Sequence, residues 1–353
     1  MHNSLKGIRV IDASTVLAGP SVGTFFAELG ADVLKVEHPK HPDVTRSWKL
    51  PAEESDSPVS AYFSSINYLK DYTSLNLRDE TDLEAFLNHI SSADILITNF
   101  KYGDAEKFDI TDEKLLSINP KLIIGKINGY GSEDDRVAYD LILQAESGFM
   151  SMNGTPESGP VKMPVAMIDV MAAHHLKEGI LLALYEREKT GKGKSLSVSL
   201  YDAALSSLVN QASNYLMAGH IPQRIGSLHP NIAPYGELFE TSDNFIITFA
   251  IGSNDHFLKL CIELDAVSLV SDQRFSENRS RVINRVELKE ALTPLVAKRT
   301  STSILSALHK VNVPAGRIQN LKDVFSSKKA QSLVREETIS GVPTKRVTSV
   351  VFK

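Results

Sequence analysis

Several features are scarce or absent in this sequence of 353 residues, and each absence excludes a class of protein. The one cysteine, Cys261, excludes internal disulfides and multi-cysteine metal sites, so we expect a reducing, cytoplasmic setting. No apolar run approaches the roughly 18–20 residues that cross a membrane, and the first residues lack the apolar core of a signal peptide. The net charge of −5 argues against nucleic acid as the main partner, so an anionic ligand would need a local cluster of basic residues.

Common cofactor and metal motifs are also missing. The turn after the first predicted strand reads Ala18-Gly19-Pro20-Ser21 and not G-x-G-x-x-G, so we expect no dinucleotide site. The sequence contains no P-loop, no H-E-x-x-H and no G-x-S-x-G motif. His174 and His175 are adjacent and diverge by about 100° on a helix, so they do not form a metal-binding pair. We therefore predict that the protein has no metal site.

The first third of the chain alternates between strand and helix patterns. Residues 8–13 and 32–37 are predicted strands, and the helix between them ends at Gly30. This arrangement is typical of a βαβ unit with parallel strands and a right-handed crossover. The pattern recurs, which predicts an α/β fold with a Rossmann-like open sheet. The further predicted strands are 73–77, 93–100 and 121–129, and the further predicted helices are 80–91 and 112–118.

The remaining sequence predicts a second, smaller domain. Residues 170–187 and 200–218 have helical spacing, and the Gly-, Pro- and His-rich stretch 219–236 is typical of a long loop or linker. We expect a large α/β domain at 1–205, a linker at 206–225, a smaller α+β domain at 226–300, and a return segment at 301–353 that completes the large domain.

Asp169 stands between two apolar stretches, just before the predicted helix 170–187. As a helix cap, it would accept hydrogen bonds from the free backbone N–H groups of the first turn. As a nucleophile, it would be held ionised by those same N–H groups. The local pattern leaves both interpretations open.

Segments along nearly the whole chain resemble the family III CoA-transferases, also called the CaiB/BaiF family. These segments are LKGIRVIDASTVLAGPSVGTFFAELGADVLKVEHP (5–39), NYLKDYTSLNL (67–77), ADILITNFKYGDAEKF (93–108), YDLILQAESGFMSMNGTP (139–156), the stretch from Val165 to Leu205, GSLHPNIAPYG (226–236) and NVPAGRI (312–318). One departure is that Asp71-Tyr72 follow Lys70, where the family usually has a basic residue and serine. The resemblance implies a homodimer of interlocked, ring-shaped subunits.

In this family the aspartate that corresponds to Asp169 is the catalytic nucleophile. It would attack an acyl-CoA thioester to form a mixed anhydride and then an aspartyl-CoA thioester, and a free carboxylic acid would exchange into the acyl position. Backbone N–H groups near the helix start would stabilise the oxyanions. The resemblance places Tyr139, Asp140 and Gln144 at the substrate site.

The resemblance further implies that CoA or acyl-CoA binds as a substrate, with no tightly bound cofactor. A strand-to-helix turn offers free N–H groups to an anion, and basic side chains supply charge that the acidic chain otherwise lacks. The residues that would contact CoA are Val16, Leu17, Ala18, His38, Lys70, Asn99, Phe100, Lys107 and Arg136.

Some positions differ from particular members of the family. Formyl-CoA transferases have glutamine at Leu17, arginine at His38 and a glycine run near 251–254 that shields the intermediate, so we expect larger carboxylic acids than oxalate. Whether the loop 251–255 has that shielding role here stays open. The racemases of the family have a catalytic histidine at Tyr139, which argues against racemisation. The alternatives are an acyl-CoA racemase or epimerase of the same fold, or a non-catalytic CoA-binding protein.

Overall fold

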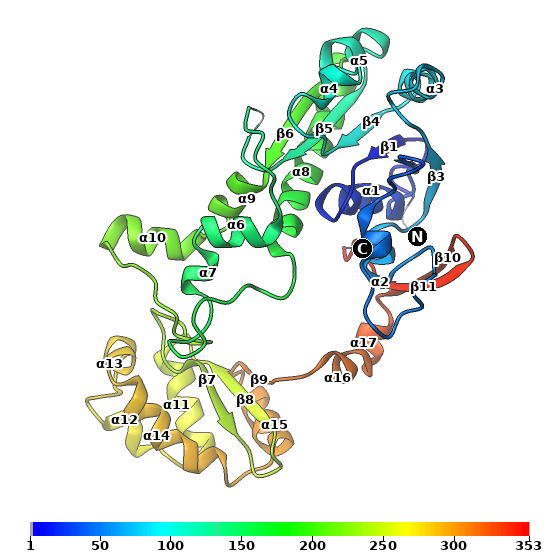
Figure 1. The fold of residues 1–353 in the computed structure, drawn as a ribbon. Helices are drawn as coiled ribbons and strands as arrows, with labels where there is room; N and C mark the ends of the chain where they lie inside the picture. Colours follow the sequence, from blue (N-terminus) through cyan, green and yellow to red (C-terminus); the bar gives the residue numbers. More distant parts are fainter. Residues whose placement is uncertain (1–2, 132, 353) are drawn as a thin grey trace. The chain divides into compact units, whose positions relative to one another are not determined.

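The computed structural model describes residues 3–131 and 133–352 and contains two compact units. The larger unit comprises the chain up to Ser151, Val161–Pro222 and the chain from Lys329 on. The smaller unit comprises Met152–Pro160 and Gln223–Lys328. The chain therefore leaves the larger unit and returns to it, which the colours of Figure 1 let the reader follow.

A parallel sheet of six strands forms the centre of the larger unit, and it confirms the predicted α/β class. The strand order is β3-β2-β1-β4-β5-β6, so the direction of winding reverses between β1 and β4. Such a reversal leaves a crevice at the carboxyl ends of the strands. The strands are β1 (Arg9–Ala13), β2 (Asp32–Glu37), β3 (Lys70–Ser74), β4 (Ile95–Thr98), β5 (Ile123–Asn128) and β6 (Lys194–Ser199).

Helices cover both faces of this sheet (Figure 1). Helices α1 (Ala18–Glu28) and α8 (Met167–Thr190) share one apolar core with the sheet, and α3 (Glu80–Ser91) and α5 (Asp112–Ile118) share the other. Strand side chains alternate between the two cores, since successive residues of a strand point to opposite faces. The predicted bounds of β2, α3 and α5 are confirmed. Strand β3 begins at Lys70 and not at residue 73, because Lys70 pairs with Val33 of β2.

The smaller unit contains an antiparallel sheet and a helical layer. Its strands are β7 (Tyr235–Glu240), β8 (Ile246–Ala250) and β9 (Ala315–Arg317), in that order. Its helices are α11 (Asn254–Glu263), α12 (Ser268–Ser271), α13 (Asn278–Ile283), α14 (Arg285–Val296), α15 (Ser301–Lys310) and α16 (Leu321–Phe325).

The unit boundaries differ from the expected ones. Residues 301–328 belong to the smaller unit, because β9 pairs with β8 and because Ile304 and Leu308 of α15 lie in its core. The expected linker 206–225 is largely helical and lies in the larger unit up to Pro222. Strand pairing between distant segments sets these boundaries. A local sequence pattern carries no information about such pairing.

Within the larger unit, one buried carboxylate on α1 binds the segment from Lys329 on. Glu28 of α1 pairs with Arg346, and both side chains are 5% exposed. The Glu28 carboxylate also accepts hydrogen bonds from the Thr348 hydroxyl and from the N–H groups of Ser349 and Val350. The segment carries a hairpin of β10 (Val334–Ile339) and β11 (Val342–Val347).

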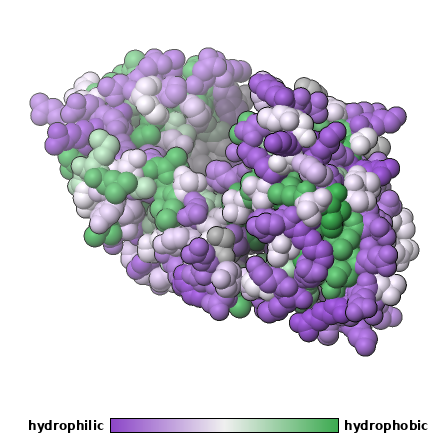
Figure 2. Space-filling view, turned by 90° about the horizontal axis from the view of Figure 1, so that it is seen from above, coloured by the Kyte–Doolittle hydropathy of each residue, from purple (hydrophilic) through white to green (hydrophobic). Residues whose placement is uncertain are grey.

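The remaining elements are short helical segments in loops and at the unit borders. None of the helices in the described part of the chain has the length and apolarity that crossing a membrane needs. The face shown in Figure 2 is mostly hydrophilic, with apolar residues in patches among the polar ones. These elements are η1 (Val44–Ser47), α2 (Ala61–Ile66), α4 (Asp104–Lys107), α6 (Asp140–Glu146), α7 (Phe149–Met152), α9 (Leu200–Ser206), α10 (Val209–Ala218) and α17 (Lys328–Gln331).

Candidate active site

Asp169 lies in the first turn of α8, three residues after the N-cap residue Ala166, and is 7% exposed. Burial, and to a smaller extent the charge of Asp140, raise the pKa of its carboxyl group from 3.8 to about 7. Asp169 does not act as the helix cap, because it lies inside α8, and the side chain that accepts a hydrogen bond from this helix end is that of Asp140. The expectation that N–H groups hold Asp169 ionised is also wrong, because burial and the charge of Asp140 raise its pKa. A buried carboxylate without a counter-charge is reactive and readily changes its protonation state.

Asp140 and Gln144 fix the segment that leads into α8. One oxygen of Asp140 accepts a hydrogen bond from the N–H of Ile168 (2.7 Å), and the other accepts one from the Gln144 amide (2.5 Å). The Gln144 side-chain oxygen accepts a hydrogen bond from the N–H of Met163 (2.8 Å). Both side chains are buried. Helix α6 thus holds this segment at two points, and Asp140 binds one of the free N–H groups at the start of α8.

Tyr62 of α2 is a candidate site residue that the sequence did not reveal. Burial, together with the charges of Asp169, Asp140 and Asp43, raises the pKa of its phenol to about 12. Its hydroxyl therefore stays protonated and can donate a hydrogen bond near Asp169. The ring packs edge-on against Trp48, with 5.2 Å between the centroids. Residues 44–66 have no regular apolar period, so no sequence signal singles out Tyr62.

The turn between β1 and α1 uses three successive N–H groups internally. As a result, the N–H of Val16 is not available to a ligand, contrary to the expectation for this turn. Among the described residues, the N–H groups of Leu17, Ala18 and Gly19 have no protein acceptor. These groups can bind an oxyanion or a phosphate. The three internal hydrogen bonds run from Ser14 to Asp12 (3.1 Å), from Thr15 to Asn99 (3.0 Å) and from Val16 to Asp43 (3.2 Å).

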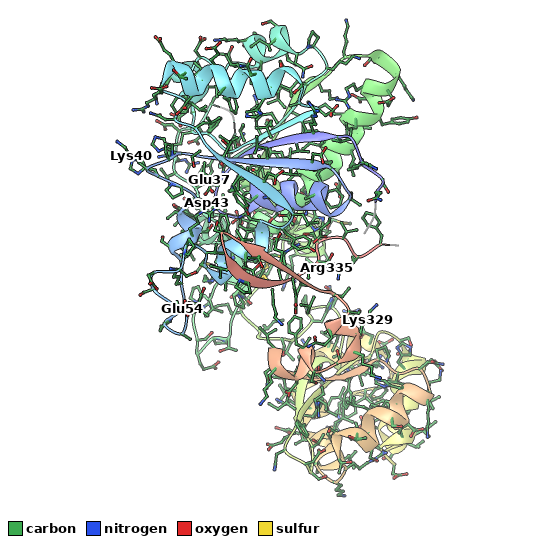
Figure 3. All side chains as sticks on the ribbon, turned by 90° about the vertical axis from the view of Figure 1, so that its right-hand side faces the viewer. Glu37, Lys40, Asp43, Glu54, Lys329 and Arg335 are labelled. Atoms are coloured by element: carbon green, nitrogen blue, oxygen red, sulfur yellow. The ribbon has the colours of Figure 1, made fainter. Side chains whose placement is uncertain are left out.

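A cavity of about 600 Å³ lies at the carboxyl ends of β1 and β2 and beside the segment that follows β3. Thr15, His38 and Phe100, which come from three different βα connections, are part of its wall. His38 accepts hydrogen bonds at Nδ1 from the N–H groups of Lys40 and His41, which leaves Nε2 for a ligand. Figure 3 shows Lys40 at the edge of the unit, with Glu37 and Asp43 farther inside. The basic lining residues are His38, Lys40, His41 and Arg78.

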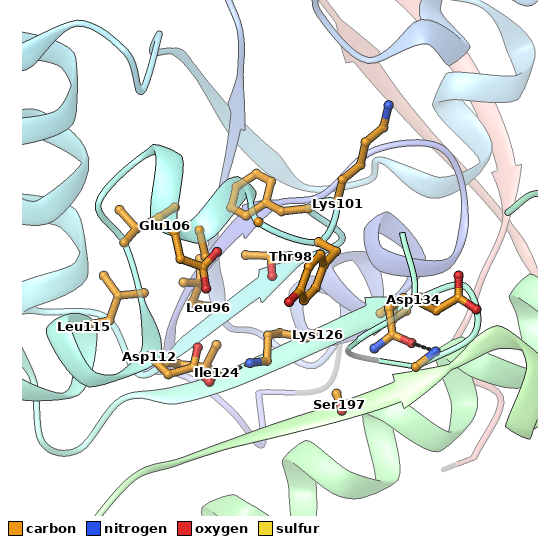
Figure 4. A pocket seen from close by; sticks show the side chains of 18 residues that line it. Leu96, Thr98, Lys101, Glu106, Asp112, Leu115, Ile124, Lys126, Asp134 and Ser197 are labelled. Atoms are coloured by element: carbon orange, nitrogen blue, oxygen red, sulfur yellow. Dashed lines mark hydrogen bonds and ion pairs between the residues drawn. The ribbon is translucent and has the colours of Figure 1, made fainter. Parts of the chain in front are cut away.

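A second cavity, of about 260 Å³, lies at the carboxyl ends of β4 and β5 (Figure 4). Phe100 lines both cavities, since it follows β4. The Lys126 ammonium is 2.5 Å from the Asp112 carboxylate, so this positive charge is already paired. Lys101 points away from the other lining residues in Figure 4. The larger cavity is therefore the better place for an anionic ligand.

The sequence and the fold match one family of enzymes. The CoA-transferase family III model matches residues 5–351. The chain belongs to this family. It is 35% identical to the succinate–glutarate CoA-transferase of Agrobacterium fabrum, over 93% of this chain and 83% of that one. It is 36% identical to the acetyl-CoA:oxalate CoA-transferase of Acetobacter aceti, over 90% and 81%. The crystal structure of a CaiB/BaiF family protein from Brucella suis is 34% identical and has a TM-score of 0.85, over 100% and 93%.

In this family III CoA-transferase, Lys70 does not lie where it could make the CoA contact that the resemblance implies. Its ammonium is fully buried and lies 2.7 Å from Asp12 and 2.8 Å from the Asn67 side-chain oxygen. It also donates to the carbonyl oxygens of Pro20 and Ile66. Helix α1 covers the pair closely, since a Cβ on Gly23 would come within 2.8 Å of the Asp12 carboxylate. Lys70 is therefore a structural cation, and its expected contact with CoA is not supported.

The other predicted basic residues are exposed, and acids already surround them. Lys107 has a 61% exposed side chain and pairs with Asp104, which lines the larger cavity. Arg136 stacks on the Tyr130 ring at 3.6 Å and pairs with Asp134 and Glu146. Neither residue presents a free positive charge in this arrangement.

The remaining predicted residues differ in what they contact. Asn99 donates to and accepts from Thr15, so it joins the end of β4 to the turn after β1. Tyr139 is the N-cap residue of α6 and is 48% exposed. In the smaller unit, Ser253 of the loop 251–255 caps α11 through the N–H of His256. No group of three or more metal-binding side chains occurs in residues 3–131 or 133–352.

Proposed function

We propose that the protein transfers CoA from an acyl-CoA donor to a free carboxylic acid and that Asp169 is the nucleophile. The observation that carries this proposal is a buried carboxylate in the first turn of α8 whose pKa is raised to about 7 by burial and by the charge of Asp140. Membership of a family whose matched relatives are named CoA-transferases supports it.

The ionised Asp169 carboxylate attacks the thioester carbonyl carbon, the C–S bond breaks, and CoA thiolate leaves. A mixed anhydride remains, and the thiolate then attacks its aspartyl carbonyl and releases the donor acid. The acceptor carboxylate attacks the resulting aspartyl-CoA thioester and forms a second anhydride. CoA thiolate finally attacks the acyl carbonyl of that anhydride, which gives the new acyl-CoA and restores Asp169. Anhydride and thioester are close in energy, so every step is reversible.

The protein stabilises the oxyanions of these steps through hydrogen bonds. The candidate donors are the Tyr62 hydroxyl and the free N–H groups of Leu17, Ala18 and Gly19. Donors of this kind are effective in a site that excludes water. Asp140 and Gln144 position Asp169 through the segment 163–168.

CoA binds in the cavity of about 600 Å³. Its phosphates would pair with His38, Lys40, His41 and Arg78, which supply positive charge in a protein with a net charge of −5. Phe100 offers an apolar ring face for the adenine. This arrangement replaces the earlier expectation that Lys70 binds a phosphate.

The acceptor is a dicarboxylic acid larger than oxalate. The names of matched relatives include glutarate and mesaconate, although one includes oxalate. The sequence supports a larger acid, because Leu17 stands where formyl-CoA transferases have glutamine, and Ile251-Gly252-Ser253-Asn254 replaces their glycine run. A panel of acyl-CoAs and carboxylates read by mass spectrometry would identify the pair.

The protein acts as a homodimer. Helix α10 supports this proposal, because Tyr215, Leu216 and Met217 on it are 54%, 78% and 88% exposed. Consecutive exposed apolar side chains of this size are typical of a surface that a partner covers. Light scattering should give the dimer mass, and a stable monomer at low micromolar concentration would contradict it.

The deciding experiment follows the covalent intermediate. Incubated with its donor acyl-CoA, the protein should gain the mass of an acyl or CoA group on Asp169, and Asp169→Asn should not. In heavy water, (2R)-methylacyl-CoA should take up no deuterium at the α-carbon while acyl exchange proceeds. Rapid deuterium uptake without transfer would favour a racemase, and CoA binding without either reaction would favour a non-catalytic protein.

A further inference from the structure

The turn between β1 and α1 contains an unusual backbone conformation. Val16 has a φ of +72°, a left-handed value that β-branched residues rarely adopt. Such a conformation persists only where the surrounding structure holds it. The φ and ψ angles of Val16 also set the orientation of the following peptide, and therefore of the Leu17 N–H.

Asp43 is the group that holds Val16. Its side chain is fully buried, and its two oxygens lie 3.3 and 3.2 Å from the Val16 nitrogen. The Lys35 ammonium, also fully buried, lies 3.3 Å from Asp43 and donates to the Ser14 carbonyl oxygen at 2.7 Å. The Lys35–Asp43 ion pair thus makes hydrogen bonds to the backbone on both sides of Thr15. Thr45 completes the contacts of Asp43 through its N–H (3.0 Å) and its hydroxyl (2.7 Å).

The charges of Asp43, which holds the turn, and of Asp169, the proposed nucleophile, both act on the phenol of Tyr62. After burial, the charges of Asp169, Asp140 and Asp43 all raise the pKa of Tyr62. Thr15 and Asp43 also line the larger cavity. The free N–H groups that follow Val16 therefore come shortly after a residue of the cavity wall, Thr15.

We propose that Asp43, with Lys35 behind it, is a positioning residue for substrate binding. It holds Val16 in the left-handed conformation, so that the N–H groups of Leu17 and Ala18 face the bound acyl-CoA. Without the carboxylate, Val16 relaxes to a negative φ and the Leu17 N–H turns away. The inference rests on the proposed function, because the ligand that these groups face is the CoA thioester.

The test compares three variants by CoA affinity, by kcat/KM for acyl transfer and by Tm. Asp43→Asn should weaken CoA binding and lower kcat/KM by about 10–100-fold, the loss expected for one hydrogen bond to a charged group. Thr45→Val is the matched control: it removes another donor to the same carboxylate and should lower Tm while largely keeping kcat/KM. Adding Val16→Gly to Asp43→Asn should recover about tenfold, because glycine adopts a positive φ without strain.

Two results would overturn the proposal: equal losses in Asp43→Asn and Thr45→Val at similar Tm, or no recovery with Val16→Gly. If Asp43→Asn does not fold, Lys35→Met/Asp43→Asn replaces it, since removing both partners leaves no unpaired buried charge. If the wild-type protein binds CoA but transfers no acyl group, the proposed function fails, and the CoA affinities of the variants still decide the role of Asp43. If the wild-type protein binds no CoA, both proposals fail.

Discussion

Asp12 and Asp169 are both buried in the larger unit, with 0% and 7% of their surface exposed. Burial acts to raise the pKa of each carboxyl group. For Asp12 the charges of Lys70 and Lys35 outweigh burial and lower the pKa to about 2. For Asp169 the charge of Asp140 adds to the effect of burial, and together they raise the pKa to about 7.

The comparison shows that the counter-charge, and not burial, separates the pKa of a structural carboxylate from that of the proposed nucleophile. Both residues follow isoleucine in an apolar stretch, at Ile11-Asp12 and Ile168-Asp169. They differ in what other segments bring to them: β3 brings Lys70 to Asp12, and α6 brings Asp140 near Asp169. An unpaired buried carboxylate is costly to the fold, and its retention points to a function.

The largest expected effect comes from removing the reactive carboxylate. Asp169→Asn should lower kcat by about 10⁴-fold or more, as the loss of other nucleophiles does. Asp12→Asn, in contrast, should lower stability, because it leaves Lys70 buried and unpaired. Acyl transfer measured on both variants checks the contrast, and near-normal turnover in Asp169→Asn would end the nucleophile assignment.

The next effect concerns the structural pair. Lys70→Met should lower the free energy of unfolding by about 3–5 kcal/mol, because it removes the ion-pair partner of the buried Asp12 and leaves Lys35 as its remaining counter-charge. The double variant Asp12→Asn/Lys70→Met should lose less, since neither charge remains. Urea unfolding measures both values. If the single variant kept its stability but lost CoA affinity, Lys70 would be a ligand contact after all.

The sequence predicted the elements that local pattern determines, and it missed contacts between distant segments. The bounds of β2, α3 and α5 follow from apolar spacing and turn residues. The burial of Lys70 depends on β3 lying beside β2. The partner of Lys70, Asp12, is 58 residues away in the sequence. Asp140 accepts a hydrogen bond from the N–H of Ile168, which is 28 residues away in the sequence. The sequence around Asp169 therefore could not reveal which side chain binds the start of α8.

The third effect is a pH dependence of acyl transfer, which follows from the raised pKa of Asp169. In the proposed mechanism Asp169 must be ionised to attack, so kcat/KM should rise with pH through about 7 and then level off. Asp140→Asn removes a negative charge and should move this rise to lower pH by about one unit or less, because burial is the larger cause. A pH–rate profile of both proteins checks the shift, and a movement to higher pH would be inconsistent with it.

Stability should depend on pH in opposite directions for the two groups. The raised pKa of Asp169 favours its protonated form in the folded state, so its contribution is present below about pH 4 and is lost as the pH rises toward 7. The lowered pKa of Asp12 gives a contribution present above about pH 4 and lost as the pH falls toward 2. In Asp169→Asn the loss of stability between pH 4 and 7 should therefore be smaller than in the wild type, which thermal unfolding across this range measures.

The smallest effect is expected at an exposed ion pair. Lys107 is 61% exposed and pairs with Asp104, and exposed pairs contribute about 0–1 kcal/mol. Lys107→Ala should therefore change CoA affinity by less than about fivefold, with normal folding. Calorimetry with CoA gives the value, and a loss of 100-fold would mean that Lys107 leaves Asp104 to bind a phosphate.

The carboxylate of Glu28 has a consequence for how the chain folds during synthesis. Its partner Arg346 follows 318 residues later, so the ribosome releases α1 long before the group that neutralises it. At about 5–20 residues per second, that delay is roughly 15–60 s. For that time the larger unit holds a glutamate without its partner, and the smaller unit emerges in between. The residues around Arg346 therefore dock on α1 only late in synthesis, after the smaller unit has emerged.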